Sequence, residues 1–227
     1  MTALSNTKAK FRSLSSKLTR SYRLHVRGSR YWQQHVAIPH YLHMNEGAKK
    51  LHLGCGGNYM PGWINIDLSP DTRADMVWDV TRGIPLESGS ITSIYSEDFI
   101  EHITLEQGTE VLEECFRVLE RGGFLRILTP DLLIFAKTYI NREQTSLDWY
   151  GESFGTKTFG EMFNMGMRMG GHTFLYDEET LDLVLESVGF EVFTGSFNES
   201  PSPELSDLDI RGDGMSIYRD CKKPESA

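Results

Sequence analysis

The sequence has few cysteines and no long apolar run. Its three cysteines, Cys55, Cys115 and Cys221, lie far apart, and no two of them have the spacing of a metal site. A disulfide framework is therefore not expected, and a reducing compartment such as the cytoplasm fits best. No stretch approaches the roughly eighteen consecutive apolar residues of a membrane-spanning helix. Apolar residues make up 39% of the 227-residue chain and charged residues 24%, which predicts a largely globular protein.

Acidic residues are almost missing from residues 1–48, which we call the basic arm. The arm holds eight Lys or Arg and one acid, Glu46, so it carries +7. Because the whole chain carries −9, the rest of it carries −16. Three interpretations fit the arm: a helix packed on its own acidic body, an amphipathic helix on the inner face of a membrane, or a mitochondrial transit peptide. The acidic body argues against a nucleic-acid partner, because it would repel a phosphate backbone.

Several catalytic signatures are also missing. There is no Walker sequence, no G-x-S-x-G nucleophile turn and no Tyr-x-x-x-Lys pair of the kind that relays protons in nicotinamide enzymes. His102 and His172 have no Cys, His or acidic partner at a recognisable ligand spacing, so the sequence predicts no metal site. The oligomeric state has no visible sequence signal.

Strand-like and helix-like segments alternate through residues 49–223, which we expect to form one domain. Helices are predicted over 104–123, where Thr104 and Gln107 form a capping box, and from Asp177 to Gly189. This alternation favours a parallel sheet with helices on its faces and ligands at the carboxyl ends of the strands. The predicted strands are 51–53, 63–68, 74–80, 91–98, 124–131, 189–197 and 214–222.

Residues 131–173 interrupt the alternation with a segment rich in aromatic residues, methionine and glycine. Methionine adapts to irregular surfaces, and long insertions at strand ends are often functional. One interpretation is a cap over the strand ends that shapes a substrate pocket. The other is a helical insertion that packs its apolar residues into a core of its own.

A glycine-rich turn follows the first predicted strand, in the sequence "LHLGCGGNYMPGWINIDL". It begins like the dinucleotide fingerprint G-x-G-x-x-G, but Tyr59 occupies the third glycine position. Only ten residues, Gly54 to Trp63, separate the two strands, which leaves no room for the helix that holds a pyrophosphate. The turn therefore favours a cofactor without phosphates, and Gly54 and Gly56 allow a close backbone approach to it.

Two acids follow at the ends of the next two strands. Asp67 can accept hydrogen bonds from both hydroxyls of a ribose, and Asp79 can accept one from an adenine amino group. Each acid alone is weak evidence, because aspartate often follows a strand simply to stabilise a turn. A glycine turn followed by two such acids, in register with successive strands, indicates an adenosine site.

Together these motifs resemble class I S-adenosylmethionine-dependent methyltransferases. The resemblance is carried by "LHLGCGG", "INIDL", "WDV", "SIYSEDFIEHI", "LERGGFLRILTPDL" and "HTFLYDEETLDLVLESVGFE", and it covers about residues 50–222. It is closest to a small bacterial branch linked to glycan and cell-envelope gene clusters. It implies a Rossmann-like α/β fold with a seven-stranded, mostly parallel sheet, an antiparallel last strand, helices on both faces and a shortened first crossover.

The resemblance also implies site residues for S-adenosylmethionine. Asp67 would bind the ribose hydroxyls, and Asp79 with Val80 would contact the adenine. The methionine side would be lined by Gly54, Cys55, Gly56 and, after the fourth strand, Ser96. One position departs from the family: many members have an acid two residues before the first glycine, where this chain has His52.

Methyl transfer to a hydroxyl also needs a base, and histidine is the commonest choice. His172 follows the insertion and two glycines, and it is our candidate base; the alternative is a buried or loop-anchoring histidine. Asp131 could bind substrate or orient His172, or it could cap a helix after Pro130. His102 is expected to be structural. Glu97 and Asp98 could reach the pocket or cap the following helix. His172 and Asp131 are therefore our two candidate catalytic residues.

The sequence therefore predicts a methyltransferase that modifies a small-molecule or glycan-type acceptor, at oxygen. Two alternatives remain open. One is a methyltransferase-like fold without catalysis that serves as a partner subunit through its basic arm, an option kept open by His52. The other is a nicotinamide-dependent oxidoreductase, against which the glycine pattern counts. A cytoplasmic location is expected, with peripheral membrane contact if the arm binds lipid.

Overall fold

The computed structural model describes residues 41, 47, 49–212 and 214–226. The basic arm and its three interpretations thus lie almost entirely outside the described residues. Among those that are described, no helix has the length and apolar character needed to cross a membrane.

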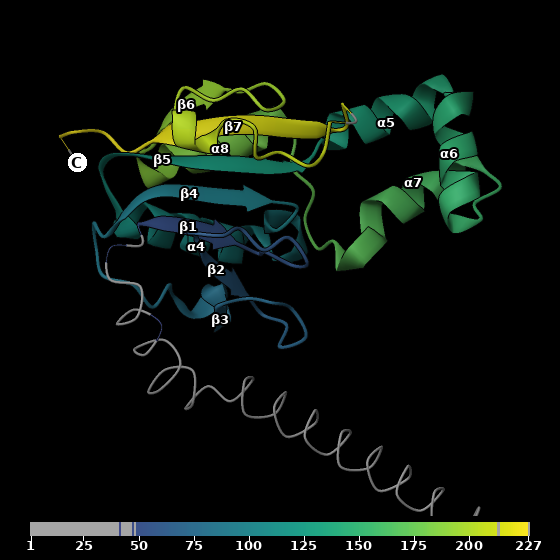
Figure 1. The fold of residues 1–227 in the computed structure, drawn as a ribbon. Coiled ribbons are helices and arrows are strands. Elements are labelled where there is room, and N and C mark those ends of the chain that lie inside the picture. Colours follow the sequence, from purple (N-terminus) through teal and green to yellow (C-terminus); the bar gives the residue numbers. More distant parts are fainter. Residues whose placement is uncertain (1–40, 42–46, 48, 213, 227) are drawn as a thin grey trace, which may run out of the picture.

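One sheet of seven strands organises the molecule, in the order β3-β2-β1-β4-β5-β7-β6 (Figure 1). Strands β1 to β5 pair in parallel, whereas β7 runs antiparallel to both β5 and β6. This confirms the predicted Rossmann-like sheet with its reversed last strand. The strands are β1 Lys50–Leu53, β2 Ile64–Asp67, β3 Met76–Val77, β4 Ile91–Glu97, β5 Leu119–Pro130, β6 Glu191–Thr194 and β7 Ser216–Lys222.

The two faces of the sheet differ in chemistry, because successive side chains of a strand point to opposite sides. In β1, Leu51 and Leu53 join the large apolar core, whereas the buried His52 lies next to Tyr95. In β5, Leu125 and Ile127 join the same core, while Arg126 is fully buried among polar partners on the second face. We call these the apolar face and the polar face.

Two long helices, α4 (Leu105–Val118) and α8 (Glu178–Val188), cover the apolar face. The predicted capping box is present at α4, where Thr104 and Gln107 exchange side-chain and backbone hydrogen bonds. The predicted limits of α8 are also confirmed: Asp177 accepts a hydrogen bond from the Thr180 amide, and Gly189 ends the helix with a φ of 112°.

The predicted end of the first helix is wrong. We expected Gly122 or Gly123 to terminate it, but α4 ends at Val118 and the extended Leu119 already begins β5, pairing with Ile91. The predicted strand over 74–80 is also too long, because β3 comprises only Met76–Val77.

The polar face is covered mainly by irregular chain. The connection between β1 and β2 contains turns and no helix, which confirms the shortened crossover. Its Met60 and Trp63 form a small cluster with Tyr95, Leu128 and Leu205. Leu205 belongs to η5 (Pro203–Leu205), a single 3-10 turn, which is the helical element covering this face within the described part of the chain.

The insertion at 131–173 folds as three helices, α5 (Leu132–Asn141), α6 (Gln144–Phe154) and α7 (Phe159–Arg168). They have a small core of their own, built on Phe135, Tyr150 and Met162. Figure 1 shows them beyond the end of the sheet at which β4 and β5 terminate. The insertion thus combines both expectations, since it has its own core and also lies at the strand ends.

Candidate active site

The glycine turn after β1 depends on the absence of side chains. Gly54 has a φ of +64°, and a Cβ added to it would lie 2.7 Å from the Cβ of Phe99. Gly56 also has a positive φ, of +49°, and its amide donates a hydrogen bond of 2.8 Å to Oδ2 of Asp67. The other oxygen of Asp67 accepts from the Ser69 amide at 2.7 Å. Each oxygen keeps lone pairs for further donors, so Asp67 both fixes the turn and can accept from a ligand.

A first cavity of about 330 Å³ opens beside this turn. Asp67 and Asp79 line it together, as the sequence predicted. Asp79 also stabilises the turn that follows β3. Its Oδ1 accepts a hydrogen bond from the Thr81 hydroxyl at 2.6 Å, and its Oδ2 forms an ion pair with Arg82 at 2.9 Å. The remaining lining residues are Gly54, Gly56, Ile66, Leu68, Trp78, Val80, Thr81, Asp98, Phe99, His102 and Ile103. Acids and flat apolar side chains together suit an adenosine group.

A second cavity of about 240 Å³ lies on the other side of Gly54. It shares Gly54 and Asp98 with the first, so the two cavities adjoin. Cys55 lines it, and burial raises the pKa of its thiol to about 12, which keeps the sulfur protonated and unreactive. Asp98 has a φ of +50°, a left-handed conformation that is uncommon for residues other than glycine and tends to occur at functional sites.

Ser96 is not where the sequence placed it. It lies within β4 rather than after it, is 2% exposed and lines neither cavity. The second cavity is lined instead by Glu97, the last residue of β4, and by Asp98, which follows it. Glu97 accepts hydrogen bonds from the amides of Ile210 and Arg211 and thus holds a distant loop at the strand end.

His52 replaces the family's acid without leaving a polar group unpaired. Its Nδ1 lies 3.1 Å from Oδ1 of Asn65, and Asn65 in turn is hydrogen-bonded to Asp75. Burial lowers the pKa of His52, so the ring is neutral around pH 7. His52 also lines the second cavity, where it offers a neutral ring in place of a carboxylate.

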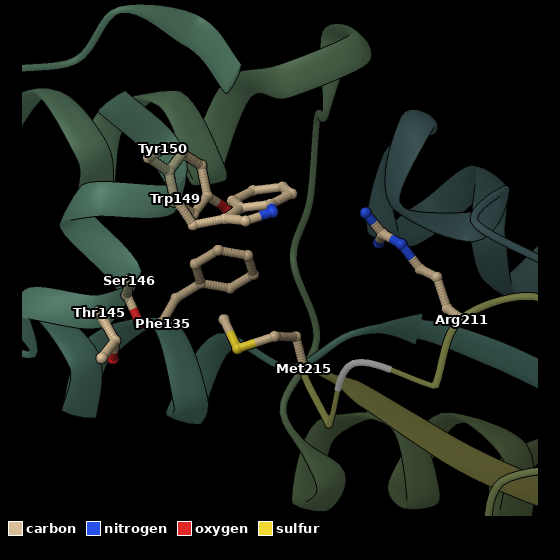
Figure 2. A pocket seen from close by; sticks show the side chains of 7 residues that line it. All are labelled: Phe135, Thr145, Ser146, Trp149, Tyr150, Arg211 and Met215. Carbon is tan, nitrogen blue, oxygen red and sulfur yellow. The ribbon is translucent and has the colours of Figure 1, made fainter. Parts of the chain in front are cut away.

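A third cavity, of about 310 Å³, lies between the insertion and the sheet (Figure 2). Figure 2 shows Phe135, Trp149, Tyr150 and Met215 on one side and Arg211 across from them. Trp149 is 52% exposed, whereas Phe135 and Tyr150 are buried. Arg211 lines both the second and the third cavity, so each of the three cavities shares at least one lining residue with a neighbour.

The structure gathers Glu101, His102 and His172 into one group, which we call the histidine cluster. The rings of His102 and His172 are 5.0 Å apart, and Nε2 of His172 is 4.0 Å from Oε1 of Glu101. Burial is the main cause that lowers the pKa of His172, and the neighbouring His102 adds to it. Burial also raises the pKa of Glu101 to about 8. The sequence spacing indicated no acidic partner for these histidines, and the fold brings Glu101 to His172.

Asp131 takes the capping role. Its Oδ1 accepts from the Leu133 amide at 2.7 Å, and it stands at the N-cap of α5. Capping was one of the two alternatives for Asp131; the carboxylate that faces His172 is that of Glu101. His102, which was expected to be purely structural, lines the first cavity.

Sequence reasoning missed three contributors to this region. Arg211 lies in an irregular loop with no motif, and Glu101 appeared only as a neighbour of His102. Phe99, in the turn after β4, packs against Gly54. Trp149 did carry a signal, because it belongs to the aromatic insertion that was predicted to shape a pocket.

Comparison with known proteins gives one family match. Residues 51–127 match the family model described as a methyltransferase domain. No curated protein matches the sequence.

Two solved structures illustrate the similarity of fold. One is a SAM-dependent methyltransferase from Archaeoglobus fulgidus, with 17% identity, a TM-score of 0.48, and coverage of 90% of this chain and 99% of that one. The other is phosphoethanolamine N-methyltransferase 2 of Haemonchus contortus, with 15% identity, a TM-score of 0.45, and coverage of 77% of this chain and 48% of that one.

Proposed function

We propose that this chain is a class I S-adenosylmethionine-dependent methyltransferase whose acceptor is a hydroxyl of a small or glycan-type molecule. The match of residues 51–127 to a methyltransferase domain and the mostly parallel seven-stranded sheet support the proposal. The observation that carries the proposal is the third cavity. It adjoins the cofactor region through Arg211, and its wall includes the exposed ring of Trp149.

The cofactor fits the first two cavities. Asp67 would accept from the ribose hydroxyls, and Asp79 with Val80 would contact the adenine. Gly54, Cys55 and Gly56 would line the methionine side. When bound, S-adenosylmethionine supplies a methyl group on a sulfonium, and its transfer breaks the carbon–sulfur bond and returns the electron pair to sulfur.

The third cavity suits a hydroxylated ring. A flat indole such as Trp149 can stack on the apolar face of a sugar, while Thr145 and Ser146 offer hydroxyls for hydrogen bonds. Arg211, which is paired with Asp98 at 3.1 Å, would favour acceptors that also carry an acidic group. Pockets of this size with an aromatic wall and a few polar groups are typical of small-ligand sites.

The acceptor proton is assigned to the histidine cluster, with His172 as the base. Its lowered pKa means that the imidazole is neutral near pH 7 and able to take a proton. The hydroxyl oxygen forms its bond to the methyl carbon as the proton passes to His172. Asp131 would act only indirectly. It is the N-cap of α5, the first helix of the insertion, and so sets the direction of that helix.

Calorimetric titration of the full chain with S-adenosylmethionine, S-adenosylhomocysteine and NAD tests the cofactor. We expect micromolar binding of the first two and none of NAD. Asp67→Ala should weaken binding about 10- to 100-fold, because it removes charge-assisted hydrogen bonds. Asp71→Ala, an exposed acid in the following turn, is the matched control. Equal affinities of the two variants would contradict the assignment of Asp67.

The acceptor is tested by following S-adenosylhomocysteine release over a panel of sugars, glycosides and amines. We expect turnover with hydroxyl acceptors. Trp149→Ala should raise the acceptor KM about tenfold or more without changing cofactor affinity, since stacking to an aromatic ring contributes about 1–3 kcal/mol. Ile140→Ala, which removes an exposed apolar residue of α5 outside the cavity, is the control. Turnover with amines alone would overturn the proposal of O-methylation.

A further inference from the structure

Glu101 presents an unusual buried carboxylate. Its side chain is 0% exposed, in the single 3-10 turn η3 (Ile100–His102) that follows β4. Oε2 accepts a hydrogen bond from the Thr129 hydroxyl at 3.0 Å, but Oε1 has no hydrogen-bond partner among the residues that the structure describes. A buried acceptor without a partner costs free energy, so the position of Oε1 calls for a ligand.

His172 points a second acceptor at the same place. Its Nδ1 lies 3.2 Å from the carbonyl oxygen of Gly166. A carbonyl can only accept, so Nδ1 carries the proton and Nε2 carries a lone pair. Nε2 lies 4.0 Å from Oε1 of Glu101, too far for a direct hydrogen bond. When Glu101 is ionised, as it would be with a cation beside it, two lone pairs therefore converge on one small space. A ring N–H donated to a backbone carbonyl is also the usual support of a metal-binding histidine.

His102 supplies a third ligand atom. The available atoms of the three side chains all lie within 4.8 Å of one another. Two features hold them together. The backbone oxygen of Glu101 accepts from the amides of Thr173 and Phe174, at 2.7 and 3.1 Å, which fastens the His172 segment to η3. Gly170, with a φ of +67°, leaves room for the His102 ring, since a Cβ there would lie 3.1 Å from its Cε1.

From this geometry we propose that the histidine cluster, Glu101, His102 and His172, binds a divalent transition-metal cation. Two imidazoles and one carboxylate suit Zn²⁺, Mn²⁺, Fe²⁺ or Co²⁺ better than Mg²⁺ or Ca²⁺, which prefer oxygen ligands. Bonds of about 2.0–2.2 Å to Oε1 and Nε2 sum to about 4.0–4.4 Å, enough for one cation to bridge their 4.0 Å separation. Three protein ligands leave a coordination position open, as in catalytic rather than structural sites.

The position of the cluster gives the cation a role. His102 lines the first cavity, so a cation held by it lies beside the cofactor region. The catalytic part of this inference rests on the proposed function; the binding itself does not. A hydroxyl that ligates the cation loses its proton to water more readily, because the positive charge stabilises the oxyanion. The cation then replaces His172 as the means of activating the acceptor, with no change of oxidation state.

The test uses the full chain, freed of metal by a chelator and then titrated. Mn²⁺ binding is followed by electron paramagnetic resonance, and Zn²⁺ binding by competition with a chromophoric chelator. We expect one ion per chain. Glu101→Gln and His172→Asn should each weaken binding at least about tenfold, because each removes one ligand. Glu106→Gln, an exposed acid of the first turn of α4, should leave the affinity unchanged.

Two results would overturn the site: no saturable binding to the wild-type chain, or equal binding in all the variants. Cofactor titration and thermal melting confirm that each variant is folded. If Glu101→Gln does not fold, His102→Asn and His172→Asn carry the test, since neither residue is fully buried. Cofactor binding and methyl transfer without any metal binding would refute the metal site alone. Metal binding without transfer to any hydroxyl would refute the proposed function alone.

Discussion

At the scale of single residues, Gly54 has little room for a side chain. Its positive φ and its closeness to Phe99 both exclude a side chain. Gly54→Ala should destabilise the fold by about 1–3 kcal/mol, as overpacking does elsewhere, and should weaken cofactor binding. Gly57→Ala in the same turn is the matched control, because a Cβ there meets nothing within 4 Å. Denaturant unfolding and calorimetry measure both effects, and equal losses in the two variants would contradict the steric argument.

The sequence located residues that line the first cavity better than the groups around them. Gly54, Asp67 and Asp79 lie along consecutive stretches whose spacing is fixed by strand geometry, so a motif can find them. Glu101 and His172 meet only because the segment after α7 returns to η3. Arg211 is positioned by Glu97, a residue from another part of the chain. Such contacts depend on tertiary structure, and a local pattern carries no record of them.

Among the secondary-structure elements, α4 has the clearest local determinants. Thr104→Ala removes the hydrogen bond to the Gln107 amide and should lower the free energy of unfolding by about 1 kcal/mol. Thr109 is half-buried in the same helix, and its hydroxyl donates to the Leu105 carbonyl; Thr109→Ala should change the free energy of unfolding by less than about 0.5 kcal/mol. Urea unfolding measures the difference, and indistinguishable variants would argue against the cap.

Helix beginnings were predicted more accurately than one of the helix ends. Thr104 and Asp177 act through side chains that bond their own helix, so the sequence shows them directly. The end of α4 is set by sheet pairing instead, because Leu119, the first residue of β5, pairs with Ile91 of β4 four residues before Gly123. The insertion was recognised by composition, but its division into three helices follows from packing around Phe135, Tyr150 and Met162.

For the whole molecule, Arg126 connects the sheet to the loop that carries Arg211. Its fully buried guanidinium pairs with Asp209 and Asp220 and donates to the carbonyls of Glu199 and Ser196. Arg126→Met should therefore destabilise the fold by about 3–5 kcal/mol, because it leaves two buried carboxylates without a counter-charge.

The control is an exposed ion pair. Lys49 and Glu120 are 4.0 Å apart, with side chains 59% and 42% exposed. Lys49→Met should change the free energy of unfolding by less than about 0.5 kcal/mol. Chemical denaturation compares the two variants. A loss for Arg126→Met as small as that for Lys49→Met would mean that the buried network contributes little to holding the loop.

The polar face has a thermal consequence. Exposing hydrocarbon on unfolding raises the heat capacity, whereas exposing polar groups lowers it. This sheet buries hydrocarbon on one face and, on the other, hydrogen-bonded polar side chains, namely His52, Asn65, Ser93, Arg126 and Asp220. Its heat-capacity increment per residue is therefore expected to lie below the usual value of about 12–15 cal/mol/K. The curve of unfolding free energy against temperature is then broad and shallow. Warming and cooling away from its maximum both lower the free energy of unfolding only gradually.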